Sequence, residues 1–293
     1  MDFHSTLKRK KMRKLLLLPI LTFGLLFSSC EDSLDDFIGN TGLTDEEIKE
    51  GLKEALKVGT DTSVSILSAV DGYLKDEAVK ILLPDQVQNN IATFKGKSFT
   101  VLGITVTGQM LYEGYSNNLL GINIAGLKGK ENEVITGINR AAEQAASTAG
   151  PIFVEAITDI TIQDANNILF GGNDRAATEY LQSKTTLSLF NEYEPRIDNA
   201  LNSVKVGNAS VVTSYENFVS DYNDILSTNI PGAGTIGTLM NMELIAATDI
   251  SVHATNKGLD GLFLKVADEE EDIRKDPLAR VNAILQKVFG ELD

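Results

Sequence analysis

Apolar residues recur at helical spacing along most of the chain from residue 44 onward. Thr44 and Glu47 form a capping-box pattern, in which the hydroxyl and the carboxylate bond each other's backbone N–H groups at a helix start. Apolar positions then follow at near-helical spacing until Gly59, a residue type that commonly ends helices. The pattern therefore predicts a first helix over residues 44–59.

Proline, glycine and capping residues divide the rest of the chain into further helical segments. Thr161 and Asp164 form a second capping-box pattern, and Pro195 is expected to break or kink the long segment that Asn173 or Asp174 caps. The Ala-rich face of residues 133–148 would let a partner helix approach closely. The further helices that we predict cover residues 63–74, 84 onward, 133–148, 151–160, 161–170, 174–204, 211–226, 245–267 and 277–292.

Two regions lack the helical period. Residues 97–129 combine β-branched and aromatic residues with several glycines, which favours a β-hairpin or a long packed loop. Residues 227–239 contain Pro231 and several small residues, and we expect a linker or surface loop there. The chain is therefore predicted to be all-α, a multi-helix bundle that forms a single domain over residues 44–293, with a small β-hairpin or long-loop insertion around 97–129.

The first thirty residues have the pattern of an export signal. Six cations within residues 8–14 precede thirteen mostly apolar residues, 15–27, and small residues then lead to Cys30. The apolar run is shorter than the ~20 residues of a membrane-spanning helix. Residues 27–30, Phe-Ser-Ser-Cys, resemble the relaxed lipoboxes of Bacteroidetes lipoproteins, in which the signal is removed before a cysteine that carries diacylglycerol.

We therefore expect residues 1–29 to be a lipoprotein signal peptide, Cys30 to be lipidated, and residues 30–43 to be an acidic tether. An unpaired thiol in an oxidising compartment favours this interpretation, because lipidation consumes the thiol. The alternative is a soluble exported protein with an incidental free cysteine. The lipoprotein would be exported and held on the outer membrane through the lipid on Cys30, on the periplasmic side or at the cell surface.

The composition excludes several classes of function. The formal net charge is −15, from 26 Lys and Arg against 41 Asp and Glu, so the chain lacks the basic face that a nucleic-acid binder needs. A single Cys excludes intramolecular disulfides and Cys-rich metal sites. The acidic run 268–272 lacks the spacing of a calcium loop and is expected to be a solvated helix face. Residues 232–237 match the glycine pattern of a dinucleotide-binding loop but lack its strand–helix context, so we expect no cofactor and no metal. The lack of an evident nucleophile–base pair disfavours an enzyme.

Short blocks in order along the chain resemble one family. They are residues 51–56 (GLKEAL), 71–73 (DGY), 83–84 (LP), 139–143 (NRAAE), 164–169, 176–180, 258–259 (GL), 273–277 (IRKDP) and 288–290 (VFG). Together they resemble the exported bacterial proteins grouped as domain of unknown function 4197, over residues 45–293. Residues 97–129 look like an insertion, and residues 205–245 show little match. The resemblance implies an all-helical fold and a periplasmic or outer-membrane setting, and it implies no activity.

Two functional hypotheses remain open. The first is a non-enzymatic helical module that binds or scaffolds a protein or small-molecule partner at the envelope. The second is a small-ligand binder or enzyme that uses a polar cluster between helices, and it requires several side chains to converge on a concave pocket. The candidates for that cluster lie within the blocks that carry the resemblance: Arg140, Glu143, Asp164, Thr178, Arg274 and Asp276.

Structural roles compete for the same residues. Arg140 and Glu143 are three positions apart, so they share a helix face and suit a buried ion pair. Asp164 suits a helix cap. Pro277 ends one helix or begins the next, which places Asp276 at the N-cap of a helix over 278–292. Arg274 would then lie near enough to reach a carboxylate such as Glu143 across the bundle.

Overall fold

Eleven α-helices and four two-stranded antiparallel hairpins make up residues 42–293, the part of the chain that the structure, a computed structural model, describes. Residues 43–293 form one compact unit. The expected all-α fold is confirmed, because the only sheets in this part of the chain are the small hairpins. The predicted signal peptide over 1–29, Cys30 and the tether as far as residue 41 lie outside the described residues.

The helices and hairpins follow one another along the chain without a long structureless segment between residues 85 and 240. The α-helices are α2 (Asp45–Ser68), α3 (Asp85–Gly96), α4 (Gly108–Glu113), α5 (Lys128–Ala146), α6 (Gly150–Thr158), α7 (Ile162–Phe170), α8 (Ala176–Ser203), α9 (Val211–Ser227), α10 (Ile236–Met240), α11 (Ile250–Lys275) and α12 (Ala283–Phe289). The hairpins are β1 (Ser98–Val101) with β2 (Ile104–Thr107), β3 (Tyr115–Asn117) with β4 (Ile122–Ile124), β5 (Lys205–Val206) with β6 (Ala209–Ser210), and β7 (Asn229–Ile230) with β8 (Gly234–Thr235). Two 3-10 helices, η1 (Pro277–Ala279) and η2 (Gly290–Leu292), flank α12.

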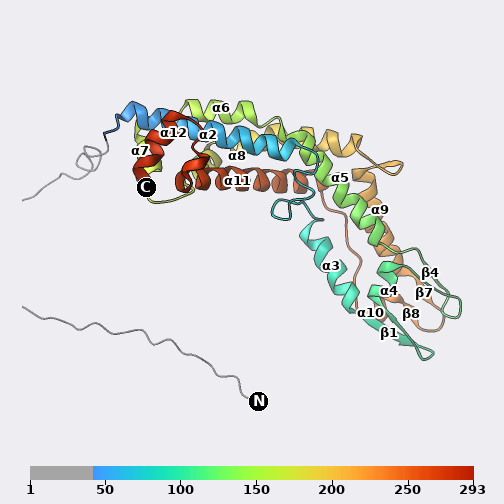
Figure 1. The fold of residues 1–293 in the computed structure, drawn as a ribbon. Helices are drawn as coiled ribbons and strands as arrows, with labels where there is room; N and C mark the ends of the chain where they lie inside the picture. The colour runs from blue at the N-terminus through green and yellow to red at the C-terminus, as the bar shows by residue number, and fades with distance from the viewer. Residues whose placement is uncertain (1–41) are drawn as a thin grey trace, which may run out of the picture. The chain divides into compact units, whose positions relative to one another are not determined.

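Three long helices, α2, α8 and α11, lie together and form the centre of the main helical layer (Figure 1). The apolar stripe predicted for α2 is buried, with Ile48, Leu52 and Leu56 each at most 3% exposed. Gly51 lies on the same face, and a Cβ atom there would approach Val288 Cγ2 to 2.5 Å. The missing side chain therefore lets α12 pack directly on α2.

A group of short elements lies beyond the ends of α5 and α9 (Figure 1). It contains α3, α4, α10 and the hairpins β1–β2, β3–β4 and β7–β8. Phe99 pairs with Val106 across β1–β2, and both side chains are buried. The hairpin alternative for residues 97–129 is thus confirmed, with two hairpins and a short helix there. The expectation of a linker or surface loop over 227–239 is wrong, because β7–β8 and α10 occupy these residues.

Helix α2 does not end at Gly59 but continues to Ser68, so a separate helix over 63–74 is also wrong. Packing of α2 against α11 outweighs the tendency of Gly59 to end the helix. A Cβ atom on Gly59 would lie 3.5 Å from the Cβ atom of Glu269, which indicates close packing of α2 against α11. Thr60 and Ser63 face the core and donate their hydroxyls to carbonyls of the preceding turn.

Three other helix boundaries differ from the predictions. Helix α8 runs through Pro195 unbroken; this residue is on the exposed side of the helix, where water can satisfy the carbonyl that loses its N–H donor. Helix α11 spans Ile250–Lys275 rather than 245–267. The predicted helix over 277–292 is instead a 3-10 turn followed by α12, which begins only at Ala283 because Asn282 caps it.

Candidate functional site

The six candidate side chains occupy four separate places and do not converge on one pocket. Arg140 and Glu143 belong to one buried network, and Thr178 and Arg274 belong to another. The carboxylates of Asp164 and Asp276 each cap a different short helix. The structure therefore divides the predicted cluster into two networks and two caps.

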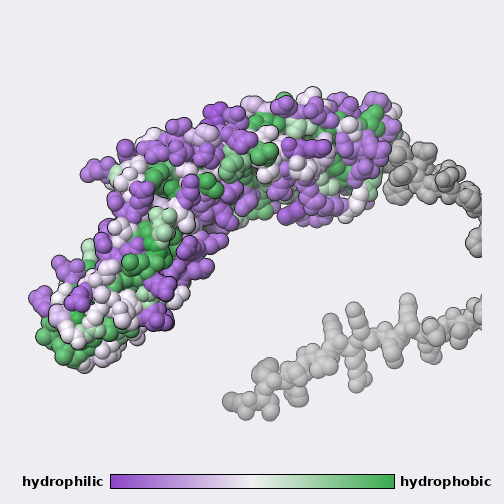
Figure 2. Space-filling view, turned by 180° about the vertical axis from the view of Figure 1, so that it is seen from behind, coloured by the Kyte–Doolittle hydropathy of each residue, from purple (hydrophilic) through white to green (hydrophobic). Residues whose placement is uncertain are grey.

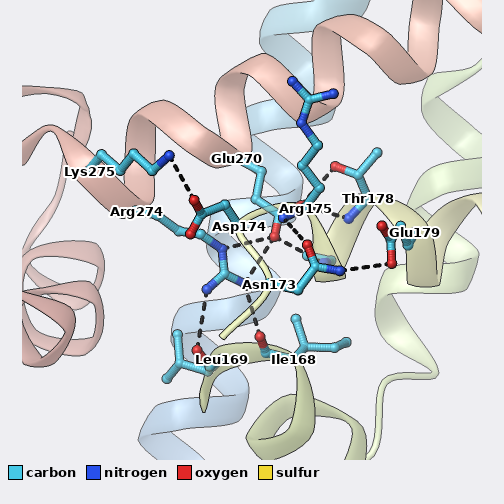
Figure 3. A network of polar contacts seen from close by, with 11 residues as sticks. Ile168, Leu169, Asn173, Asp174, Arg175, Thr178, Glu179, Glu270, Arg274 and Lys275 are labelled. Carbon is cyan, nitrogen blue, oxygen red and sulfur yellow. Dashed lines mark hydrogen bonds and ion pairs between the residues drawn. The ribbon is translucent and has the colours of Figure 1, made fainter. Parts of the chain in front are cut away.

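The first network surrounds Glu270, and we call it the Glu270 network (Figure 3). The carboxylate accepts hydrogen bonds from the backbone N–H groups of Ala177 and Thr178, at 3.0 and 2.7 Å, and from the Thr178 hydroxyl at 2.8 Å. The Arg274 Nε donates to the same carboxylate at 3.0 Å. Both Glu270 and Arg274 are only 6% exposed.

The Glu270 network joins the ends of two helices. Arg274 also donates to the carbonyls of Ile168 and Leu169 at the C-terminus of α7, at 3.0 and 3.2 Å (Figure 3). The carboxylate thus lies at the positive end of α8 and the guanidinium at the negative end of α7, which is the favourable arrangement of charges with helix dipoles. Arg274 does not reach Glu143, so the expected pairing across the bundle is wrong.

Ion pairs at the protein surface lie next to this network. Lys275 contacts Asp174 and Glu271, each at 2.7 Å, and lowers the pKa of both carboxyls. A cavity of about 10 Å³ lies beside Glu270, which is about the space of one water molecule. The Glu270 network is therefore filled by its own partners and has no room for a substrate.

Glu270 is not among the residues that the sequence predicts for the site, because its position in the acidic run 268–272 indicates a solvated face. Glu270 is buried instead, and the pKa of the neighbouring Glu269 carboxyl is raised by burial and by nearby acidic groups. The one usable signal was the spacing of Glu270 and Arg274, which are four residues apart and therefore adjacent on one helix face.

The second network surrounds Arg140 on α5, and we call it the Arg140 network. The guanidinium donates to Glu143 Oε2 and to Asp71 Oδ1, both at 2.6 Å. The other Glu143 oxygen accepts from the backbone N–H groups of Tyr73 and Leu74, both at 3.4 Å. Lys75 and Arg140 together hold the pKa of the Asp71 carboxyl below its ordinary value.

The Arg140 network belongs to a larger set of contacts that fix residues 69–84, the connection between α2 and α3. Asn139 on α5 accepts from the N–H of Ile81 at 2.9 Å and donates to the Ile81 carbonyl at 2.8 Å. From α11, the Gly258 carbonyl accepts the Tyr73 hydroxyl at 2.7 Å. His253 Nε2 lies 2.8 Å from the Leu82 carbonyl, and because a carbonyl only accepts, this nitrogen carries the hydrogen. Polar groups of two helices therefore hold this connection in place.

A surface groove of about 420 Å³ lies between this connection and α11, and we call it the His253 groove. Leu82 and Leu264 supply apolar surface to it. Its charged and polar side chains come from both walls: Lys80, Asp85, Gln88, His253, Lys257 and Asp260. Its lysines make only surface ion pairs, since Lys257 is 3.7 Å from Asp260 and Lys80 pairs with the exposed Glu77. His253 and Gln88 are bonded to backbone carbonyls. This groove offers both signs of charge beside an apolar floor.

Asp164 and Asp276 lie elsewhere. The Asp164 carboxylate accepts from the Thr161 N–H and hydroxyl in the predicted capping box, contacts that lower the pKa of its carboxyl. It also lines a second groove, of about 350 Å³, with Tyr180 and Lys184. Asp276 is exposed and accepts from the Leu278 N–H at 2.9 Å, so it caps η1 rather than a helix over 278–292.

Residues 42–293 contain neither a metal-binding cluster nor a helix able to span a membrane. No group of three or more His, Cys, Asp or Glu side chains there is arranged to hold a metal ion. In the same residues, every helix is too short or too polar to cross a membrane.

Comparison with known proteins identifies one family. The family model described as "Protein of unknown function (DUF4197)" matches residues 42–100 and 118–290. No curated protein and no solved structure matches the chain. The unmatched residues 101–117 fall inside the segment predicted to be an insertion, whereas the expectation of little match over 205–245 is wrong.

Proposed function

The chain belongs to the DUF4197 family, and we propose that it is a non-enzymatic envelope lipoprotein whose helical domain binds a small polar ligand in the His253 groove. The observation that best supports this proposal is the set of hydrogen bonds that fixes residues 69–84 against α5 and α11. Side chains of α5 and α11 fix the backbone of this connection, and the fixed connection forms one wall of the groove. A wall that is rigid before the ligand arrives reduces the entropy lost on binding.

The chemistry of the groove suits a ligand that carries both charge and apolar surface. Lys80 and Lys257 provide cations, Asp85 and Asp260 provide anions, and Leu264 provides apolar contact. A short peptide or an amino-acid derivative has this combination of groups. We favour binding over catalysis because the buried acids Glu143 and Glu270 have their oxygens occupied by structural partners.

The proposal can be tested by filling the groove. Ala78 is exposed and lines it, so Ala78→Trp should occupy the groove without disturbing the core. The matched control is Ser188→Trp, an exposed position in the second groove. In native mass spectrometry of protein released from envelopes with detergent, we expect a bound small molecule in the wild type and in Ser188→Trp, and its loss in Ala78→Trp. Equal occupancy in all three proteins, or none in the wild type, contradicts the proposed site.

The envelope location rests on the lipobox-like residues before Cys30, and a separate experiment tests it. Two or three acyl chains would hold the protein stably on a bilayer, at about 0.8 kcal/mol per buried CH₂. Cys30→Ser should therefore abolish metabolic labelling with a fatty acid and leave the protein unprocessed or released from membranes. Labelling that persists without Cys30, or a wild type found wholly in the soluble fraction, contradicts this part of the proposal.

A further inference from the structure

Three segments at one end of the described domain lack charged side chains. Residues 98–112, 114–127 and 225–242 contain no Asp, Glu, Lys, Arg or His, although 23% of the whole chain is charged. These segments come from distant parts of the sequence and meet in space, since a Cβ atom on Gly121 would lie 3.8 Å from Pro231 Cδ, and α10 packs on β1. They form the end that carries α4, α10 and three hairpins, and we call it the hairpin end (Figure 1).

Two leucines project from turns of the hairpin end. Leu102, between β1 and β2, is 72% exposed, and Leu119, between β3 and β4, is 67% exposed. Figure 2 shows apolar surface gathered at the tip of this end, in contrast to the hydrophilic surface over most of the long helices. Large apolar side chains at the apex of a turn are the first atoms to meet any surface that the hairpin end approaches.

The backbone at Leu102 is strained. Its φ is +52° and that of Gly103 is +77°, the left-handed pair that a two-residue hairpin turn requires. Asn or Gly suits the first position, whereas a leucine there has both an unfavourable backbone conformation and a water-exposed side chain. No contact within the described domain offsets the backbone strain or the exposure of Leu102, which points to a contact outside the domain.

We propose that the hairpin end inserts Leu102 and Leu119 into the interface of a lipid bilayer. Charged groups are strongly disfavoured at membrane depth, and residues 98–112, 114–127 and 225–242 of the hairpin end have none. The remainder of the chain is acidic, so an uncharged end is the part of the molecule that an anionic lipid surface repels least. Charged groups border these segments: Lys128 lies 3.5 Å from Glu113, and the Lys95 ammonium lies 4.6 Å from the centre of the Tyr112 ring.

A protein partner or a second copy fits these observations less well. Protein interfaces are centred on aromatic and Arg side chains, and the three uncharged segments contain neither Trp nor Arg. The segments contain two tyrosines: Tyr112 is buried, and Tyr115, at the start of β3, is half-buried. The two exposed leucines lie on different turns, one between β1 and β2 and the other between β3 and β4.

The chain has no Trp, which allows a direct test of the hairpin end. Leu119→Trp and Leu102→Trp each place a single fluorophore at one tip, and Leu119→Trp avoids the strained position. The control is Leu187→Trp on α8, where the leucine is 73% exposed but belongs to the charged body of the domain. The full-length lipidated protein is mixed with phosphatidylcholine vesicles, with and without brominated acyl chains, and also with vesicles that contain phosphatidylglycerol.

We expect both tip variants to show a blue-shifted emission on vesicles and at least twofold stronger quenching by brominated lipid than Leu187→Trp, with weaker binding when phosphatidylglycerol is present at low salt. Tip fluorescence that stays accessible to aqueous iodide overturns the proposal. A blue shift that appears without vesicles and grows with protein concentration also overturns it, in favour of self-association. This inference does not depend on the proposed function. Protein that lacks the lipid on Cys30 can still be added to vesicles, and the tryptophan fluorescence of the two tip variants can be measured in the same way.

Discussion

At the scale of single residues, Glu270 and Arg274 explain why two buried charges are tolerated between helices. Besides their mutual ion pair, both side chains bond the backbone. The Glu270 carboxylate accepts from N–H groups at the start of α8, and the Arg274 guanidinium donates to the last carbonyls of α7. Such helix-end groups lack partners within their own helix. The ion pair therefore satisfies backbone groups that would otherwise be buried without hydrogen bonds, and it fixes the turn between the two helices.

Arg274→Met should lower the free energy of unfolding by about 3–5 kcal/mol, because it leaves the Glu270 charge buried without its counterion. Lys275→Met on the next position is the control, and it should have little effect because that ion pair is exposed. Urea denaturation monitored by circular dichroism measures both. The double variant Glu270→Gln with Arg274→Met should recover part of the loss, and an Arg274→Met protein as stable as the wild type would show that the pair contributes no stability.

Tyr222→Phe should stabilise the protein by about 1 kcal/mol. Tyr222 is fully buried on α9, its hydroxyl has no hydrogen-bond partner among the described residues, and burial raises the pKa of the phenol to about 12. The ring packs edge-on against Phe94, a contact that phenylalanine keeps. Tyr215→Phe is the matched control: its hydroxyl bonds Thr248, so removing it should destabilise. Thermal denaturation compares the two, and a lower midpoint for Tyr222→Phe contradicts the argument.

At the scale of elements, helix starts could be predicted where local side chains decide them. Both capping boxes, at Thr44 and Thr161, form as the sequence indicates. Helix ends were less predictable, because packing on distant elements decides them. Gly59 stays helical against α11, and the last helix starts late because Asn282 contacts Glu54 of α2. The same limit applies to the candidate site: sequence spacing placed Arg140 beside Glu143 and Glu270 beside Arg274, but it did not show that the second pair is buried between helices.

Asn282→Ala should cost about 1 kcal/mol of stability, the usual value for an N-cap. Its Oδ1 accepts from the Leu285 N–H at 3.1 Å, and its Nδ2 donates to Glu54 at 2.8 Å, so it both starts α12 and holds it on α2. Asp276→Ala removes only the cap of a single 3-10 turn and should cost clearly less. Chemical denaturation of the two variants decides the order. A larger loss for Asp276→Ala would restore the sequence-based view that residue 276 starts the last helix.

At the scale of the whole molecule, charge is distributed unevenly between two regions. Ion pairs connect distant elements throughout the helical layer, such as Lys265 with Asp76 and Lys287 with Glu47. Residues 98–112, 114–127 and 225–242 of the hairpin end are uncharged, and residues 101–117 lie outside the family match. The lack of charge in each segment can be read from the sequence. The segments are far apart along the chain, however, and only the fold shows that they lie at the same end of the domain.

These ion pairs make the stability of the helical layer sensitive to acid. Partner cations lower the pKa of the carboxyls of Asp71, Asp76 and Glu47, so the folded state binds protons less readily than the unfolded chain. The stabilisation is fully present above the unfolded value, ~4 for these groups, and is lost as the pH falls through the lowered folded values. We therefore expect urea midpoints to fall steeply below about pH 4.

Asp76→Asn tests this expectation at one pair. Lys265 lies 2.7 Å from Asp76 and joins the connection 69–84 to α11, so the variant should be less stable than the wild type at pH 7. The difference should shrink as the pH falls below ~4 and through the lowered pKa of the folded wild-type carboxyl. Asp85→Asn removes one exposed negative charge that makes no ion pair among the described residues, and it should stay parallel to the wild type at every pH. Parallel curves for Asp76→Asn would mean that the pair does not couple protonation to folding, and that the connection is held by the neutral contacts of Asn139 and Tyr73 instead.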